Sequence, residues 1–302
     1  MSENDDARYQ VDKRLVKAAF NAAATRYDGV AVVQREVRGR MLERLDLIRC
    51  RPQIILDAGA GTGHAAFALA QRYPDAMVIA LDIAWTMLQH AQKQTPRLQR
   101  WRKRHRWVCA DAERMPLRDE SMDLLFSNLT LQWCPSIDQA LHEFRRCLRP
   151  GGLVLFASFG PDTLRELRQC WQQVDGYNHV NAFVDMHDLG DGLIRNGFSD
   201  PVMDVETLTL TYPDALTVMH DLKPLGPHIV TAGRNRGLTT PRALRAVVER
   251  YETRRTNGTL PATFEIVYGH AWHLPRTARA KPARGGEFHI AVDSLRRPRS
   301  QQ

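Results

Sequence analysis

The sequence predicts an α/β protein built on one mostly parallel sheet with helices on both faces. From residue 53 onward, short apolar segments alternate with amphipathic ones, which is the pattern of successive strand–helix units. The first apolar segment runs into Asp57 and then into Gly59, Gly61 and Gly63, so a strand should end there in a tight turn that opens a helix. With 302 residues and 43% hydrophobic content, the chain can bury a large core.

Residues 1–50 are predicted to form an N-terminal helical cap. Apolar residues recur at helical spacing on both sides of a break at Asp28 and Gly29. Tyr27, at this break, is either a core aromatic or a phenol that points into a site. The first ten residues are polar and acidic, and no stretch approaches the length of a membrane span, so we expect a cytoplasmic protein that does not bind a membrane.

Residues 51–212 are predicted to form the core. The first five strands are expected at 54–56, 77–81, 107–110, 123–127 and 153–159, and the helices between them at about 64–73, 85–94 and 136–148. A turn at 150–152 should deliver the fifth strand. Further helices are expected at 161–174 and 186–196, followed by a strand at 202–212. A helical insertion at 213–261, with a helix at about 241–256, then precedes the last strand at 262–275 and a basic tail at 276–302.

Polar residues follow each of the first four predicted strands. Asp57, Asp82, Asp111 and Asn128 stand at these ends. Any one of them could simply cap the next helix. Because ligands of open α/β sheets bind beyond the carboxyl ends of the strands, we expect all four to share one crevice beside the glycine turn.

The glycine spacing distinguishes between nucleotide ligands. A dinucleotide fold needs GxGxxG, but here His64 takes the place of the third glycine, and a P-loop would need a GK[ST] ending that is missing. The motif instead resembles that of class I S-adenosylmethionine-dependent methyltransferases. That resemblance implies S-adenosylmethionine as cofactor and a Rossmann-like seven-stranded sheet with an antiparallel last strand. It also implies which residues contact each part of the cofactor: Asp57, Gly59, Gly61 and Gly63 near the methionine, Asp82 on the ribose, Ile83 and Met87 beside the ribose, Asp111 and Ala112 on the adenine, and Asn128 at the sulfonium.

The segment NLTLQWCP, 128–135, bears on the methyl acceptor. Amino-group methylation of nucleic acid bases usually has Asn-Pro-Pro-aromatic at this place, so nucleic acid is disfavoured. Cys134 resembles the nucleophile of cytosine-5 methylation, but it lies several residues beyond the strand end. A cysteine that follows an aromatic residue is more often packed in the core.

Seven further motifs resemble those of the biotin-pathway malonyl-acyl carrier protein O-methyltransferases over residues 12–274. They are AATRYD, SNLTLQWC, LRPGG, FGPDTLRELR, MHDLGDGLIRNGF, HDLKPLG and FEIVYGHAW. The resemblance implies methylation of the free carboxylate of malonyl-acyl carrier protein in early biotin synthesis, with the carrier as partner. The mitochondrial complex I assembly hydroxylases share much of the pattern. Methylation of another small carboxylic acid, a quinone precursor or RNA, and a non-methylating hydroxylase or assembly role, therefore remain alternatives.

A carboxylate acceptor explains why the sequence shows no general-base constellation. An ionised carboxylate needs only to be positioned in line with the sulfonium, away from water. Tyr27, Gln34 and Gln132 are the candidates for the reactive centre. Burying the malonyl carboxylate requires a cation or donor, for which Arg26, His187 and Lys223 are candidates. No metal is expected.

The net charge of +8 is concentrated in two basic segments. One spans 97–106 and the other follows residue 275. Each is either a solvated surface segment or a docking site for an acidic partner such as a carrier protein. The five cysteines, an odd number without a CxxC pair, are predicted to be reduced thiols: Cys50, Cys109, Cys134, Cys147 and Cys170.

Overall fold

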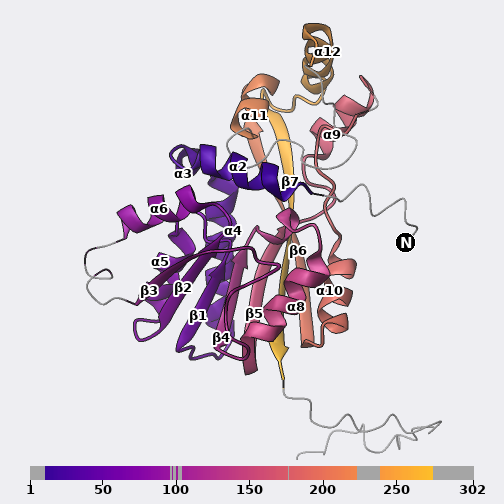
Figure 1. Cartoon of the computed structure of the whole chain (residues 1–302). Coiled ribbons are helices and arrows are strands. Elements are labelled where there is room, and N and C mark those ends of the chain that lie inside the picture. The colour runs from indigo at the N-terminus through magenta and orange to yellow at the C-terminus, as the bar shows by residue number, and fades with distance from the viewer. Residues whose placement is uncertain are drawn as a thin grey trace, which may run out of the picture.

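The computed structural model describes residues 11–95, 97, 100, 104–175, 177–222 and 239–274. Its centre is a seven-stranded sheet in the order β3-β2-β1-β4-β5-β7-β6 (Figure 1). Neighbouring strands from β3 to β5 run parallel, whereas β7 runs antiparallel to both β5 and β6. The predicted fold class, with an antiparallel last strand, is therefore confirmed.

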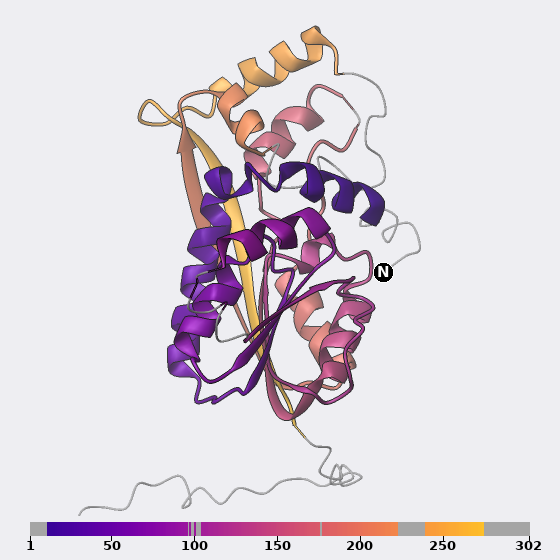
Figure 2. The same cartoon turned by 60° about the vertical axis from the view of Figure 1, so that its left-hand side comes forward.

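The central strands bury both of their faces. Successive residues point to opposite sides of a strand, so Ile55 packs into the core on one face of the sheet and Leu56 into the core on the other. Helices α4 (Val32–Leu47) and α5 (His64–Arg72) cover the first face. Helices α8 (Ile137–Cys147) and α10 (Met186–Arg195) cover the second (Figures 1 and 2).

From residue 11, where the described part of the chain begins, three helices precede the sheet instead of two. Helix α2 (Lys13–Ala23) is capped by Asp12, whose carboxylate accepts a hydrogen bond from the backbone of Arg14. A short helix α3 (Tyr27–Val30) and then α4 follow. The predicted break at Asp28 and Gly29 is wrong, because both residues lie inside α3. The helical segments are instead interrupted before and after α3. Thr62 and Gln94 donate hydrogen bonds to the Asp28 side chain and so hold α3 in place.

The first strands and helices follow the predicted order with shifted boundaries. Strands β1 (Ile54–Ala58), β2 (Met77–Asp82) and β3 (His105–Cys109) alternate with α5 and α6 (Trp85–Gln94). Strand β3 begins two residues earlier than expected. It pairs with β2 through its backbone, and the pairing tolerates the exposed Arg106 because β3 is an edge strand.

In the LRPGG segment, residues 148–152, the boundaries of the helix and the strand differ from the prediction. Helix α8 ends at Cys147, and β5 (Leu148–Phe159) starts immediately and includes the expected turn. Its pairing with β4 (Met122–Asn128) jumps from Leu148 to Leu153. Gly151, at φ +85°, supplies the left-handed turn of this interruption.

The hairpin of β6 (Ser199–Tyr212) and β7 (Leu260–His273) ends the sheet. Strand β6 begins three residues before the predicted 202, whereas β7 begins two residues before the predicted 262 and ends two residues before the predicted 275. Between them the structure describes α11 (Ala215–Leu222) and α12 (Pro241–Glu252). The division of the chain into cap, core, insertion and tail stays a prediction, and the tail lies outside the described residues.

Helix α9 (Arg165–Gln172) is shorter than predicted. Residues 160–164 are tied to β7 instead, where the backbone of Asp162 and the hydroxyl of Thr163 donate to Glu265. Helices α9, α11 and α12 lie beyond the carboxyl ends of the parallel strands, at the same end of the molecule as α2 (Figure 2). Across the described residues, no helix has the length and hydropathy needed to cross a membrane.

Candidate active site

The glycine turn after β1 is fixed against the end of β2. The backbone N–H groups of Gly59 and Ala60 both donate to the carbonyl of Leu81, at 2.8 and 2.9 Å. Gly59 has φ +83°, and a Cβ there would lie 1.9 Å from Oγ1 of Thr130. Glycine is therefore required at this position both for backbone conformation and for space.

Asp82, at the end of β2, stabilises this turn. Its two carboxylate oxygens accept the backbone N–H groups of Gly61, at 2.8 Å, and Ala84, at 2.7 Å. Burial raises the pKa of Asp82, and these two hydrogen bonds partly offset that effect. Each oxygen keeps a lone pair for a further donor, so the carboxylate can still accept hydrogen bonds from a ligand.

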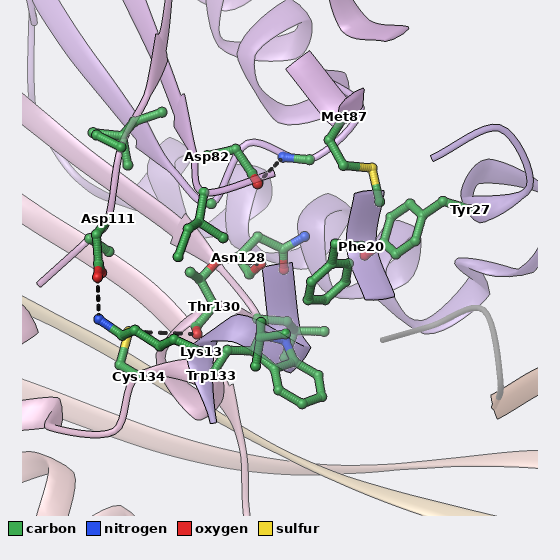
Figure 3. Close-up of a pocket in the computed structure, with 18 residues that line it drawn as sticks. Lys13, Phe20, Tyr27, Asp82, Met87, Asp111, Asn128, Thr130, Trp133 and Cys134 are labelled. Atoms are coloured by element: carbon green, nitrogen blue, oxygen red, sulfur yellow. Dashed lines mark hydrogen bonds and ion pairs between the residues drawn. The ribbon is translucent and has the colours of Figure 1, made fainter. Parts of the chain in front are cut away.

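A cleft opens beside these residues at the carboxyl ends of β1 to β4 (Figure 3). Nine of the predicted site residues line it: Tyr27, Gly59, Gly61, Asp82, Ile83, Met87, Asp111, Ala112 and Asn128. The predicted crevice thus brings together Asp82, Asp111 and Asn128 from three different strand ends. Its mixture of apolar walls and a few convergent polar groups is typical of a small-molecule site.

Helix α2 forms one wall of this cleft. Lys13, Val16 and Phe20 line it from this helix, and the Lys13 ammonium group pairs with Asp111 and with Glu113. The Phe20 ring packs edge-to-face against Trp133, with 5.6 Å between centroids. Lys13 and Phe20 were missed from the sequence, although the spacing 13, 16 and 20 puts all three residues on one helix face.

A second pocket adjoins the cleft across the glycine turn. Both pockets share Tyr27, Gly59, Gly61 and Asn128, and the second is also lined by Gln34, Arg35 and Arg38. Arg35 donates to the carbonyl of Asp28, at 3.3 Å, and Arg38 is half-buried. Burial and the neighbouring Arg35 lower the pKa of Arg38. Sequence reasoning missed both arginines, which give the pocket a positive charge.

Three buried side-chain amide oxygens have no hydrogen-bond partner among the described residues. They belong to Gln34, Asn128 and Gln132. Two of the amide nitrogens are engaged: Asn128 donates to the carbonyl of Gln34 at 3.0 Å, and Gln132 donates to the carbonyl of Leu129 at 2.7 Å. Buried acceptors without a donor are costly, and the oxygens of Gln34 and Asn128 belong to pocket-lining residues that a ligand donor would satisfy.

Asp57 lies under the glycine turn and lines neither pocket. It is fully buried, and neither of its oxygens accepts a hydrogen bond from a described residue. Burial, reinforced by the charge of Asp82, raises the pKa of Asp57 to about 7. The N–H of Ala66 and the charge of Arg38 oppose this rise, although the N–H does not reach hydrogen-bonding geometry. Gly63, the remaining glycine of the motif, caps α5 at φ +85°.

Tyr27 stands where the two pockets meet, next to Phe20 (Figure 3). Burial and the charges of Asp82 and Asp28 raise the pKa of its hydroxyl above the ordinary value. The phenol is therefore a donor and not a base at neutral pH. Cys134 also lines the cleft, and burial raises its pKa to about 12. It stays a protonated thiol, which argues against a nucleophilic role.

The three predicted substrate-binding cations do not gather at these pockets in the described structure. Arg26 is exposed beside α3, and the His187 side chain is 82% exposed next to Asp185 at the start of α10. Neither lines the cleft or the second pocket. Lys223 lies outside the described residues. Their roles stay predictions.

Comparisons with known proteins bear on the fold and the family of this chain. Residues 56–156 match the model of a methyltransferase domain. Malonyl-[acyl-carrier protein] O-methyltransferases from Nitrosospira multiformis and a Methylovorus species are 49% and 51% identical to this chain. These matches cover 90% and 87% of the chain, and 93% and 90% of the relatives.

Solved structures show the same fold at low sequence identity. A putative methyltransferase from Bacillus halodurans superposes with a TM-score of 0.56 at 18% identity, over 79% of this chain and 99% of its own. Identity that low supports the fold alone, whereas the two relatives are similar over nearly their full length. The chain belongs to the malonyl-[acyl-carrier protein] O-methyltransferase family.

Proposed function

We propose that this protein transfers a methyl group from S-adenosylmethionine to the free carboxylate of malonyl-acyl carrier protein. The products are the malonyl methyl ester and S-adenosylhomocysteine, and the step belongs early in biotin synthesis. The observation that carries the proposal is the near-50% identity over about nine-tenths of the chain to relatives of that name. The two joined pockets at the strand ends support it.

The residues present fit this cofactor. Asp82 offers free lone pairs to the two ribose hydroxyls, Ile83 and Met87 provide apolar walls for the adenine, and Asp111 would accept from its amino group. Beyond the glycine turn, the second pocket combines cations with unpartnered acceptors. S-adenosylmethionine is a nucleoside joined to a zwitterionic amino acid. Its carboxylate needs a cation, and its ammonium group needs hydrogen-bond acceptors.

Arg35 and Arg38 would hold the carboxylate of the amino acid part, because guanidinium groups match carboxylate geometry. The amide oxygens of Gln34 and Asn128 would accept from its ammonium group. Asp57, immediately beneath, would add negative charge on the same side only in its ionised form, which a bound ammonium group would favour. Positive and negative groups of the pocket are thus matched to the two charges of the ligand.

The bound cofactor supplies an electrophilic methyl group. The protein therefore needs no general base, because the malonyl carboxylate is ionised and attacks directly once it is held in line. Tyr27 keeps its proton and would donate to the incoming group at the junction of the pockets. Trp133, in the turn that follows β4, lines the cleft. Gln132, whose amide oxygen has no partner among the described residues, lines neither pocket, and its role stays a prediction.

The malonyl group would be presented by its carrier protein, and the reaction would take place in the cytoplasm. All five cysteines are free thiols, which fits a reducing compartment. The segment 213–261, which leaves the sheet at the end of β6, is proposed to contribute to the surface that meets the carrier. Nucleic acid is not proposed as a partner.

Incubation of the purified protein with methyl-labelled S-adenosylmethionine tests the proposal. Malonyl-carrier protein should become labelled, acetyl-carrier protein should not, and alkaline hydrolysis should release the label as methanol. Parallel reactions contain malonyl-pantetheine, malonyl-coenzyme A and RNA. Absence of label from every malonyl thioester would overturn the assignment, and label on RNA or on a free carboxylic acid would direct it to that acceptor.

A further inference from the structure

Two antiparallel helices at the ligand end of the molecule present an arginine-rich seam. Helix α9 packs against α12, and both lie beyond the carboxyl ends of the strands (Figure 2). On α9 and its C-cap, Arg165, Gln169 and Gln173 follow one another at intervals of four residues and are exposed. On α12 and its C-terminal turn, Arg242, Arg250 and Arg254 fall on one helix row, at intervals of eight and four residues. We call the surface formed by these two rows the α9–α12 seam.

Side-chain hydrogen bonds join the two rows. Arg254 donates to Oε1 of Gln169 at 2.9 Å, and Arg250 donates to Oε1 of Gln173 at 3.3 Å. A glutamine orders a guanidinium group without neutralising its charge. The seam therefore holds two cations in fixed positions with their charge available, which differs from an ordinary surface ion pair.

The surrounding charges strengthen this positive field. Residues 165–172 and 241–255 contain seven arginines and three glutamates. Glu166 is buried and accepts from the backbone and hydroxyl of Thr263, and Glu252 pairs with Arg255. Among the described residues, Arg242, Arg245, Arg250 and Arg254 have no carboxylate within ion-pair distance. Only the exposed Glu249 opposes them on α12.

The seam is also connected to the reactive end of the cleft. Leu129, which lines the cleft, donates its N–H to Ala157 of β5 at 2.9 Å. Strand β5 ends two residues later, and α9 begins at Arg165. By contrast, the other basic segment, around Arg100 and Arg104, precedes β3 and so lies at the amino end of that strand, away from the cleft. Arg104 there is paired with Asp75.

We propose that the α9–α12 seam is the docking surface for the acidic face of the acyl carrier protein. Acidic helices of the carrier would meet Arg242, Arg250 and Arg254, and its prosthetic arm would carry the malonyl group from there to the cleft. Charge complementarity of this kind accelerates encounter and fixes orientation. The inference rests on the proposed function and adds to it the surface used by the partner.

The charge-reversal variant Arg250→Glu/Arg254→Glu tests the seam. Its KM for malonyl-carrier protein should rise on the order of tenfold with kcat nearly unchanged, because encounter is weakened and chemistry is not. Its kinetics with malonyl-pantetheine, which lacks the carrier, should equal those of the wild type. Binding of S-adenosylhomocysteine and the unfolding temperature verify that the variant is folded.

The matched control is Arg97→Glu/Arg100→Glu, which reverses two charges in the other basic segment. This control should leave KM for the carrier substrate within about twofold of the wild type, a change of less than about 0.5 kcal/mol. An equal KM for carrier in the seam variant and the wild type would overturn the proposal. So would a larger effect in the control, or an equal loss with malonyl-pantetheine. If the wild type methylates no malonyl thioester, the proposed function fails instead.

Discussion

Asp82 has two tasks that compete for the same carboxylate. It holds the glycine turn through the N–H groups of Gly61 and Ala84, and its remaining lone pairs are proposed to accept the ribose hydroxyls. A carboxylate suits both tasks because it has four acceptor sites. An asparagine or serine at this place would supply fewer.

Replacement Asp82→Ala should therefore weaken cofactor binding. Loss of charged hydrogen bonds to the ribose should cost roughly 1.5 to 3 kcal/mol, which titration calorimetry with S-adenosylhomocysteine would measure. Asp75→Ala, at an exposed acid paired with Arg104, is the control and should bind normally. Unchanged affinity in Asp82→Ala would contradict the assignment of β2 to the ribose.

Asp57 makes the stability of the protein without ligand depend on pH. Its folded-state pKa, about 7, lies above the ordinary value of 3.8, so the folded protein binds a proton there that the unfolded chain has already released. Stability from this group is complete at about pH 4 and below, falls as pH rises, and levels off above pH 7. The slope is at most about 1.4 kcal/mol per pH unit.

Replacement Asp57→Asn removes this proton linkage while keeping the shape of the side chain. The variant should be more stable than the wild type at pH 8, and the gain should shrink steadily between pH 7 and pH 4. Urea unfolding across this range measures it. A difference in stability that does not change with pH would show that the Asp57 carboxyl titrates normally.

The anchoring of helix α2 affects how readily a ligand enters or leaves the cleft. Lys13 pairs with Asp111 and Glu113, and Asn21 binds Thr86 through hydrogen bonds of 2.6 to 3.0 Å. The helix is thus held at its first turn and near its end, with Val16 and Phe20 over the cleft between these points. A ligand that enters on this side must pass α2.

The Lys13→Met substitution should release the first turn of α2 and speed ligand departure. A partly buried ion pair contributes about 1 kcal/mol, so S-adenosylhomocysteine should dissociate roughly fivefold faster in stopped-flow displacement. Lys17→Met, one turn along at an exposed position, should leave the rate unchanged. If the two variants dissociated at the same rate, the Lys13 pairing would have no role in closing the cleft.

At the level of elements, local sequence determines most of what is observed. The glycine turn, the order of the core strands and the polar strand ends were predicted because hydrophobic periodicity and backbone conformation are local properties. Boundaries failed where distant residues intervene, as at Asp28, which Thr62 and Gln94 hold in α3, and before α9, where Glu265 of β7 keeps residues 160–164 from being helical.

The same distinction between local sequence and distant contacts applies to the residues of the site. Residues at strand ends follow from topology, so Asp82, Asp111 and Asn128 were found. Arg35, Arg38 and Lys13 were not, because which face of α2 or α4 turns toward the cleft depends on how these helices pack. The α9–α12 seam is formed by two segments some seventy residues apart. No pattern within either segment predicts that the two helices pack together.

The described elements share one hydrophobic core on the side of the sheet that carries the seam. A single cluster of buried side chains extends from Val37 of α4 through Phe126 of the sheet to Phe159, Trp171 of α9 and Val247 of α12. Glu166 adds a link between α9 and β7, since it accepts from the backbone N–H of Thr263 at 3.1 Å. Within the part of the chain that the structure describes, α9, α11 and α12 therefore belong to the core of the sheet.

Unfolding should consequently be one cooperative event in spite of the chain's length. Calorimetry should give a single transition whose van't Hoff and calorimetric enthalpies agree, and S-adenosylhomocysteine at 100 times its Kd should stabilise all of it by about 2.7 kcal/mol. Glu166→Gln weakens the link to β7 and should lower the midpoint of this transition without dividing it, whereas Glu249→Gln on the exposed side of α12 should not change it. A separate early transition in Glu166→Gln, unaffected by the ligand, would mean that α9 and α12 fold independently of the sheet. The seam would then be a mobile attachment and not a surface fixed relative to the cleft.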